Sequence, residues 1–219
     1  MRVGILATGD VSRALAKGFV ALGHEVKIGS RTATNEKAAA IVGELGGKGS
    51  AGTFADAARF GEIVVLATLG AVNDQVIAAA GPENLAGKVF IDTTNPLDFS
   101  KGMPPSLLTP EGGSGGAQVQ VLAPDAKVVK AFNSIGSPFM FKPTFPGGPP
   151  TMFIAGNDAG AKGAVTDLLK DFGWETLDVG PIQNSHHLEG LCILWVMHGA
   201  LTGKWGHAFK MLHLAEAAA

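Results

Sequence analysis

The chain has 219 residues, 46% of them hydrophobic, and its formal net charge is −2 at pH 7. That length is enough for one sizeable core, and so small a charge leaves no electrostatic footprint for nucleic acid or an anionic membrane. The single cysteine excludes an internal disulfide, so we expect a reducing, cytoplasmic setting. We expect no signal peptide, because no charged region followed by an apolar run precedes the first strand. We also expect no membrane span, because the longest apolar run near the C-terminus, 191–197, is too short to cross a bilayer.

Short apolar runs alternate along the chain with segments of helical period. Strands are expected at 2–7, 24–29, 62–68, 88–93, 126–132, 151–155 and 174–179, and helices at 11–22, 34–45, 54–60, 71–80, 158–172 and 184–202. The runs 63–67 and 89–91 are apolar on both faces, which is typical of parallel strands buried between helix layers. The alternation predicts a Rossmann-type α/β fold, with a doubly wound, mainly parallel sheet.

We expect two parts in this chain. Residues 1–182 carry the alternating pattern and should form a nucleotide-binding domain. Residues 183–219 should form a short helical C-terminal segment, whose excess apolar surface is expected to pack across a homodimer interface. Two tracts rich in glycine and proline, 101–116 and 142–150, are either surface loops or flaps over a ligand, because both follow strand ends.

The first strand, turn and helix, "RVGILATGDVSRALAKGF", occupy the place of a dinucleotide-binding G-x-G-x-x-G loop. The middle glycine, Gly9, is kept where the backbone approaches a pyrophosphate, whereas Ala7 and Ser12 replace the outer two glycines. The following helix offers free N–H groups to an anion. A carboxylate at Asp10 either repels the pyrophosphate or caps the helix N-terminus. We interpret the stretch as a working phosphate loop.

The end of the second strand, "HEVKIGSRT", predicts the choice of cofactor. An NAD-selective protein places Asp or Glu about 20 residues after the loop, to bind the ribose 2′-hydroxyl. Ser30, Arg31 and Thr32 stand there instead, with hydroxyl donors and a guanidinium suited to phosphate, and Lys37 follows one helical turn later. This arrangement favours NADP(H).

Two further strand ends should complete the cleft. Ala67, Thr68 and Leu69 end one strand and are expected beside the pyrophosphate and ribose. Asn95 and Pro96 end the next strand, where they are either a simple turn or a contact to the nicotinamide end.

The segments "GSRT", "DTTNPL", "VVKAFNSIG", "MFIAGNDAGAK" and "HHLEGLCILWV" follow one another in an order that resembles the NADPH-dependent coenzyme F420 reductase family. The resemblance covers nearly the whole chain. It implies a Rossmann domain with a small C-terminal part, a dimer, and direct hydride transfer between the nicotinamide and a deazaflavin. The acceptor implied is F420, or FMN or FAD with a link to ferric reduction.

The resemblance also implies roles for particular residues. Thr8, Gly9, Asp10 and Val11 match the family's phosphate loop, and Ser30 and Arg31 match its 2′-phosphate contacts. Thr68, Asn95 and Asn133 match positions that line the cofactor cleft, and Leu191 resembles a residue near the acceptor. Ile135 and His187 are further candidates on that side. The chain departs from the family at His186-His187 and at Gly190, and these departures concern the acceptor.

Hydride transfer between two planar rings needs stacking and no obligatory acid or base, so we expect no catalytic side chain. The sequence shows no nucleophile elbow, which agrees with the absence of a catalytic triad. It has no cysteine pair and its histidines lack the spacing of metal ligands, so we expect no metal site. Cys192 lies between leucine and isoleucine and is interpreted as a buried small hydrophobe. The alternative function is an NADP(H)-binding redox sensor or partner-binding module without turnover.

Overall fold

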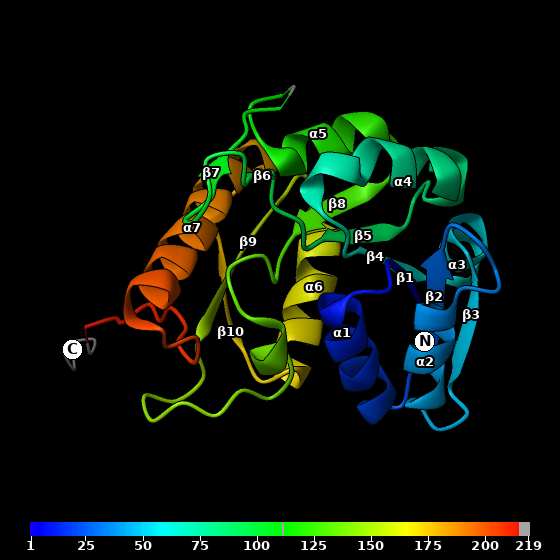
Figure 1. Cartoon of the computed structure of the whole chain (residues 1–219), viewed down its shortest axis with the longest axis horizontal. Coiled ribbons are helices and arrows are strands. Elements are labelled where there is room, and N and C mark those ends of the chain that lie inside the picture. The colour runs from blue at the N-terminus through cyan, green and yellow to red at the C-terminus, as the bar shows by residue number, and fades with distance from the viewer. Residues whose placement is uncertain (111, 215–219) are drawn as a thin grey trace.

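The computed structural model describes residues 1–110 and 112–214 (Figure 1). Position 111 of the tract 101–116 and the last five residues of the segment 183–219 lie outside the described residues. The strands are β1 (Arg2–Leu6), β2 (Glu25–Ser30), β3 (Gly49–Thr53), β4 (Ile63–Leu66), β5 (Val89–Asp92), β6 (Leu97–Asp98), β7 (Ser106–Leu107), β8 (Lys127–Lys130), β9 (Thr151–Gly156) and β10 (Glu175–Asp178). The α-helices are α1 (Asp10–Ala21), α2 (Glu36–Gly43), α3 (Phe54–Phe60), α4 (Asn73–Ala80), α5 (Gly115–Leu122), α6 (Ala159–Asp171) and α7 (Ser185–Thr202).

Eight of these strands form one sheet in the order β10-β9-β8-β5-β4-β1-β2-β3. The strands from β3 to β8 along this order are all parallel, and β9 joins β8 antiparallel. The chain winds outward from β1 through β2 and β3, then returns to the other side of β1 with β4. The order therefore reverses between β1 and β4, and ligands of such sheets bind outside the carboxyl ends of the strands at that point. The predicted doubly wound, mainly parallel fold is confirmed.

Helices cover both faces of the sheet, and a separate apolar core lies on each face (Figure 1). Alternate residues of one strand enter opposite cores: Val65 packs with α1, α2 and α6, whereas Val64 and Leu66 pack with α3, α4 and α5. This alternation explains why the central strands appear as continuous apolar runs in the sequence. Gly4 of β1 lies so close to α3 that an added Cβ would meet the Ala57 carbonyl oxygen, which fixes how tightly that helix packs.

The structure contains elements that the sequence pattern did not predict. Strand β3 has the sequence Gly-Ser-Ala-Gly-Thr, and its small residues give no apolar alternation. Helix α5 begins inside the tract 101–116, where paired glycines favour a loop, and Ser114 caps it by accepting from the Ala117 N–H. The short strand β6, which precedes this tract, pairs antiparallel with β7, which lies inside it. The tract 142–150 is a loop, as expected.

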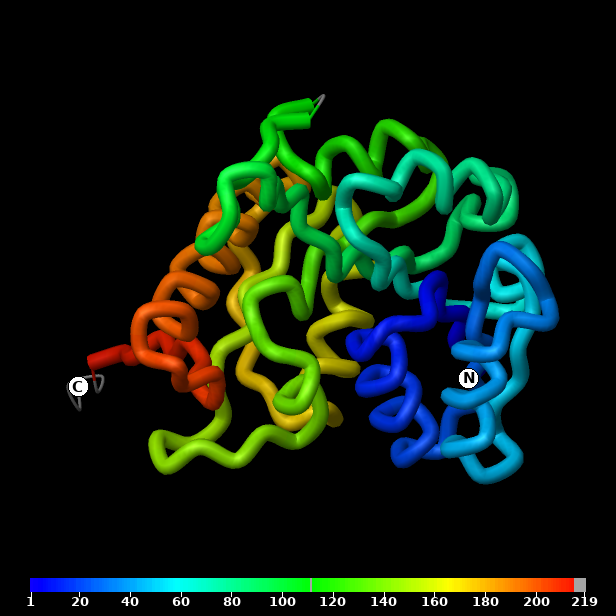
Figure 2. The backbone as a smooth tube through the Cα atoms, in the orientation of Figure 1, coloured from blue at the N-terminus to red at the C-terminus, as the bar shows by residue number. Residues whose placement is uncertain are grey.

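The C-terminal segment consists of α7 and a tail that turns back beside it (Figure 2). The tail is held by the Thr151 N–H, which donates to the Phe209 carbonyl at 2.9 Å, and by the Met211 N–H, which donates to Thr151 Oγ1 at 3.0 Å. Among the described residues, no helix combines the length and the apolar character needed to cross a membrane.

Candidate functional site: a cleft at the switch point of the sheet

A cleft of about 870 Å³ opens at the carboxyl ends of β1 and β4, where the strand order reverses. Its volume is in the range of sites that hold drug-sized ligands and cofactors. The lining residues come from the turn after β1, the ends of β2, β3 and β4, helix α4, and the loop after β8: Ala7, Thr8, Gly9, Asp10, Val11, Arg31, Phe54, Ala67, Thr68, Leu69, Val72, Gln75, Val76, Ala79 and Ser137.

The turn after β1 brings the backbone of Gly9 to the cleft at the start of α1. Gly9 is the N-cap residue, with φ −90° and ψ −173°, so its backbone conformation does not require glycine. An added Cβ would meet no heavy atom within 4 Å, so packing does not require glycine either. The space beside Gly9 is therefore kept free on the cleft side, where a pyrophosphate would approach the first N–H groups of α1.

The other altered positions of the loop have separate structural roles. Ala7 and Ser12 are buried, and their small side chains permit close packing between β1 and α1, which is the role of the outer glycines in the ordinary motif. Asp10 is the first residue of α1 and is exposed toward the cleft, while Gly9 is the N-cap. The interpretation of Asp10 as the helix cap is therefore wrong, and its carboxylate lies where an anionic ligand would meet it.

The turn after β2 places one cation in the cleft. Arg31 is exposed and lines the cleft, and within residues 1–110 and 112–214 it forms no salt bridge. Ser30 is buried, and its hydroxyl donates to the Thr32 carbonyl, which shapes this turn. Thr32 and Lys37 are exposed but do not line the cleft. Of the residues expected to select a 2′-phosphate, only Arg31 reaches the cleft.

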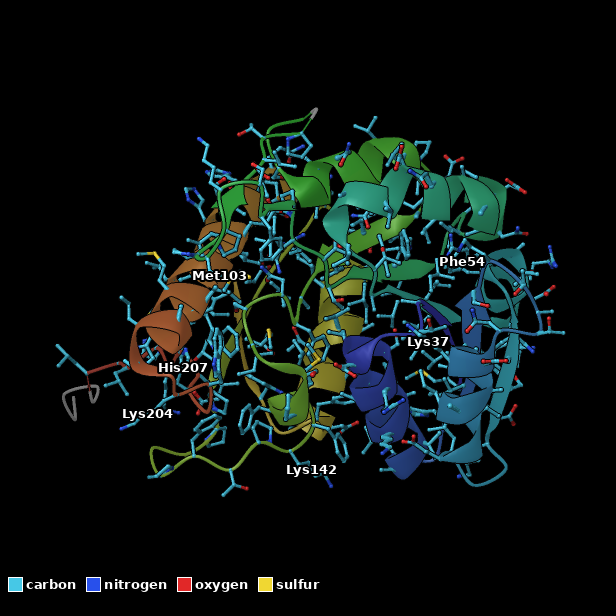
Figure 3. All side chains as sticks on the ribbon, in the orientation of Figure 1. Lys37, Phe54, Met103, Lys142, Lys204 and His207 are labelled. Atoms are coloured by element: carbon cyan, nitrogen blue, oxygen red, sulfur yellow. The ribbon has the colours of Figure 1, made fainter. Side chains whose placement is uncertain are left out.

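The end of β4 and one face of α4 form the opposite wall. Ala67, Thr68 and Leu69 line it as expected, and Leu69 is 75% exposed. Four further residues complete the wall: Val72, which is the N-cap of α4, and Gln75, Val76 and Ala79 from the side of α4 that faces the cleft. Phe54, which begins α3 after β3, lies on the same side of the molecule as Lys37, whereas His207 lies on the opposite side (Figure 3).

Asn95, Pro96 and Asn133 do not line the cleft; Pro96 and Asn133 are buried, Asn95 is half-buried, and the two asparagines bind each other. The Asn95 Nδ2 donates to the Asn133 carbonyl at 2.8 Å, and the Asn133 Nδ2 donates to Asn95 Oδ1 at 2.9 Å. The same Asn133 nitrogen also donates to the Leu188 carbonyl of α7 at 2.8 Å. Pro96 is buried beside Gly115. These contacts join the ends of β5 and β8 to the C-terminal helix.

The three residues expected on the acceptor side are divided between a loop and α7. Ile135 is buried in the loop after β8, two residues before the cleft-lining Ser137. The intervening Gly136 packs against Trp195 of α7, so this loop connects the cleft to the helix. His187 is exposed and Leu191 is half-buried on α7, and neither lines the cleft. Their assignment to the acceptor stays a prediction.

Six lining residues were not predicted from the sequence: Phe54, Val72, Gln75, Val76, Ala79 and Ser137. The helical spacing of the three α4 residues and Val72 was visible in the sequence, but nothing local showed that this face borders a cleft instead of the core. Phe54 follows Thr53 and precedes Asp56, which form a capping box that marks the start of α3. For Ser137 we find no local signal.

Two sequence-based expectations concern residues away from the cleft: that Cys192 is buried, and that the chain has no metal site. Cys192 is 6% exposed, which confirms it as a buried residue, and burial raises the pKa of its thiol to about 12. Within the part of the chain that the structure describes, no three His, Cys, Asp or Glu side chains are grouped so that they could hold a metal ion.

A family model and a solved structure both relate this chain to F420-dependent NADP reductases. The family model described as NADP oxidoreductase, coenzyme F420-dependent, matches residues 2–96, which run from β1 to the end of β5 and Pro96. A solved structure from Arthrobacter sp. FB24, provisionally assigned as an F420-dependent NADP reductase, is 38% identical, with a TM-score of 0.90; the match covers 97% of this chain and 100% of that one. The chain belongs to the F420-dependent NADP oxidoreductase family.

Two more distant relatives match over only part of their own length. The F420-dependent NADP reductase of Methanocaldococcus jannaschii is 29% identical over 148 residues, 64% of this chain and 63% of that protein. The metalloreductase STEAP3 of Rattus norvegicus is 27% identical over 191 residues, 87% of this chain but 36% of that protein. The chain thus spans less than two thirds of each of these relatives.

Proposed function

We propose that the chain binds NADP(H) in the cleft and is an oxidoreductase that transfers hydride between the nicotinamide and a planar deazaflavin or flavin-like acceptor. The observation that carries this proposal is the pairing of Gly9 with Arg31 in one cleft. Gly9 keeps a space that neither the backbone nor the packing requires, beside the N-terminus of α1. Arg31 offers a guanidinium to the same space without a carboxylate partner among the described residues.

The residues fit the phosphate groups of the cofactor. Thr8, Gly9 and Val11 surround the N-terminus of α1, where backbone N–H groups and the helix dipole favour a pyrophosphate. Arg31 would hold the 2′-phosphate through its planar fork, and Ser30 and Thr32 shape the turn that carries it. Ala67, Thr68 and Leu69 would hold the ribose side against the apolar face of α4.

The transfer itself requires alignment of two rings. NADPH, when bound, supplies the hydride, and the protein's part is to hold the two rings in contact and keep water out. We assign no side chain as a catalytic acid or base. We propose F420, or FMN or FAD with onward ferric reduction, as the acceptor, because the family's named members act on F420 and, in the rat metalloreductase, on metal.

The acceptor is proposed to bind at the Ser137 end of the cleft. A more open hollow of about 600 Å³ shares Asp10 and Ser137 with the cleft and continues along α1 past Pro138 and Phe141. The loop carrying Ile135 separates this end from α7, on which His187 and Leu191 lie. All residues that line this hollow belong to residues 1–182, the proposed cofactor domain, so a role of residues 183–219 on the acceptor side would require contacts that reach past that loop.

We also propose that α7 forms contacts between two copies of the chain. Leu194, Met197 and Leu201 are exposed by 55%, 38% and 83% and follow one another at helical spacing. Apart from the buried Glu189, this helix has no Asp, Glu, Lys or Arg, so its outer face offers apolar contact to a partner. Sedimentation equilibrium should give twice the chain mass, and Leu201→Glu should shift it toward the monomer; a wild-type monomer at 50–100 µM would contradict this part of the proposal.

Calorimetric titration with NADPH and NADH, followed by addition of F420, FMN or FAD, tests the proposed activity. We expect NADPH to bind at low micromolar concentration or tighter, and NADH at least tenfold more weakly. Arg31→Ala should remove most of that difference, because about 1.5–3 kcal/mol is typical of a hydrogen bond to a charged group. Lys37→Ala, outside the cleft, is the matched control. Tight binding without oxidation would favour a sensor, and no NADPH binding would contradict the whole proposal.

A further inference from the structure

A chain of hydrogen bonds leads from the cleft into the interior of the protein, and it starts at Thr68. The Thr68 Oγ1 lies 2.9 Å from Asn73 Oδ1, and the Asn73 Nδ2 lies 2.8 Å from Thr94 Oγ1. The Thr94 Oγ1 in turn lies 2.7 Å from Asp92 Oδ1. Asn73, Thr94 and Asp92 are each at most 2% exposed, so bulk water cannot exchange with these bonds. Only Thr68 is accessible from the cleft.

The buried ion pair at the inner end determines which group donates and which accepts in each of these hydrogen bonds. The other carboxylate oxygen of Asp92, Oδ2, accepts from Lys130 Nζ at 2.7 Å, and both side chains are fully buried. A carboxylate in an ion pair only accepts hydrogen bonds. The hydroxyl of Thr94 therefore gives its single proton to Asp92, and its oxygen is left to accept from Asn73.

The orientation of the Asn73 amide follows from this step. Its NH₂ group must face Thr94, so its carbonyl oxygen faces Thr68. A carbonyl oxygen has no proton to donate, and the Thr68 hydroxyl must therefore give its one proton to Asn73. Toward the cleft, the Thr68 oxygen has only lone pairs left.

We infer that Asn73 is a positioning residue that makes Thr68 a hydrogen-bond acceptor toward the cleft, so the ligand group that faces Thr68 is a neutral O–H or N–H donor. A phosphate oxygen would meet a second acceptor there and is disfavoured. This inference rests on the proposed function, in which the ligand is NADP(H). In that ligand the donor is a ribose hydroxyl or the nicotinamide carboxamide NH₂.

Calorimetry on Thr68 variants tests the role of its hydroxyl. Thr68→Val keeps the shape and removes the acceptor, and we expect NADPH binding to weaken about five- to thirtyfold, as for an unpaired donor on the bound ligand. Thr68→Ser should bind within about twofold of wild type. Thr166→Val is the matched control, because Thr166 is exposed on α6 and outside the cleft.

A set of analogues separates the possible donors. One is the 3-acetylpyridine analogue of NADP⁺, which replaces the carboxamide NH₂ with a methyl group; in the others, each ribose hydroxyl is removed in turn. Binding of the analogue without the true donor should be equally weak with Thr68→Val and with the wild type, because the interaction is already absent. The remaining analogues should keep the full effect of Thr68→Val. Equal losses with NADPH and with every analogue would overturn the inference.

A double-mutant cycle with Asn73→Ala tests the positioning role. Without Asn73 the Thr68 hydroxyl is free to turn, so we expect the effect of Thr68→Val on NADPH affinity to shrink at least threefold. A purely structural role would lower the melting temperature and leave that effect unchanged. If wild type binds NADPH tightly and Thr68→Val binds equally well, the inference fails and the proposed function stands. If wild type binds no NADPH, both fail.

Discussion

Lys130 and Glu189 form a fully buried ion pair, with Nζ and Oε1 2.9 Å apart, that joins strand β8 to helix α7. The two oxygens of Glu189 also accept from the backbone N–H groups of Gly115 and Gly116 at the start of α5. Burial alone would lower the pKa of Lys130, but the carboxylates of Asp92 and Glu189 outweigh it and hold that pKa above its usual value. The ammonium group thus ties β8 to β5 and α7, and Glu189 extends the connection to the start of α5.

Replacement of this ammonium should destabilise the fold strongly. Lys130→Met leaves Asp92 and Glu189 buried without a counter-charge, and we expect the free energy of unfolding to fall by about 3–5 kcal/mol. Urea unfolding measures the change. Lys17→Met is the control, because Lys17 lies 2.7 Å from Glu44 in an exposed pair and should contribute less than about 1 kcal/mol. Equal losses for the two variants would contradict a special role for the buried pair.

Gly9→Ala should separate binding from stability. The added methyl group meets no protein atom within 4 Å and the backbone at Gly9 is extended, so the free energy of unfolding should fall only by the cost of alanine at a helix N-cap, about 1 kcal/mol or less. NADPH affinity should fall at least tenfold, because the methyl group occupies the space kept for the pyrophosphate. Gly163→Ala, on helix α6 and also free of contacts, is the matched control and should leave binding unchanged. Unchanged NADPH affinity in Gly9→Ala would place the pyrophosphate elsewhere.

Asp10→Asn should strengthen NADPH binding. The carboxylate lies in the cleft at the start of α1, and removing its repulsion of an anionic ligand is worth about 1 kcal/mol near the surface, or roughly fivefold in Kd. The gain should shrink as salt is raised. Stability should fall slightly, because an acidic residue in the first helical turn is favourable. Weaker binding in this variant would indicate that Asp10 contacts the ligand as an acceptor.

Asp56 should support the fold only above acidic pH. Hydrogen bonds from the Thr53 hydroxyl and backbone N–H hold the pKa of Asp56 at about 2, with a smaller effect of Arg59. Because the folded-state pKa lies below the unfolded value near 4, the contribution is complete above pH 4 and is lost as the pH falls toward 2. The stability difference between wild type and Asp56→Asn, measured by urea unfolding, should therefore vanish over that range. A stability difference that stays constant as the pH falls from 5 to 2 would contradict this role of Asp56.

Cys192 should be inert in the native protein. Burial raises the pKa of its thiol to about 12, so almost no thiolate is present at pH 8. Ellman's reagent should react with it only at the rate at which the protein opens, and promptly in denaturant. In a Thr166→Cys variant, the added exposed thiol should react within minutes. Prompt reaction of the native wild type would show that α7 separates readily from the sheet.

Much of the fold follows from local patterns. The continuous apolar runs of β4 and β5 predict buried parallel strands, and the turn around Gly9 predicts the phosphate loop. Strand β3 was missed because its small residues carry no alternation, and its place in the sheet depends on pairing with β2. Helix α5 was missed because its paired glycines disfavour helix, while Glu189, more than seventy residues away, binds the N–H groups at its start.

The doubly wound sheet can be predicted from the alternation of strands and helices along the chain. The positions of Gly9 and of the cation at Arg31 can be predicted because each depends on residues within one strand–turn–helix unit. The folded molecule alone reveals that one face of α4 lines the cleft and that Asn95 and Asn133 bind each other outside it. The same is true of the hydrogen bonds by which Asp92 and Lys130 orient Thr68 through Asn73. Hydrogen bonds and ion pairs between distant residues leave no periodic pattern in the sequence, so they cannot be predicted from it. Their direction and strength arise only when folding removes water from around them.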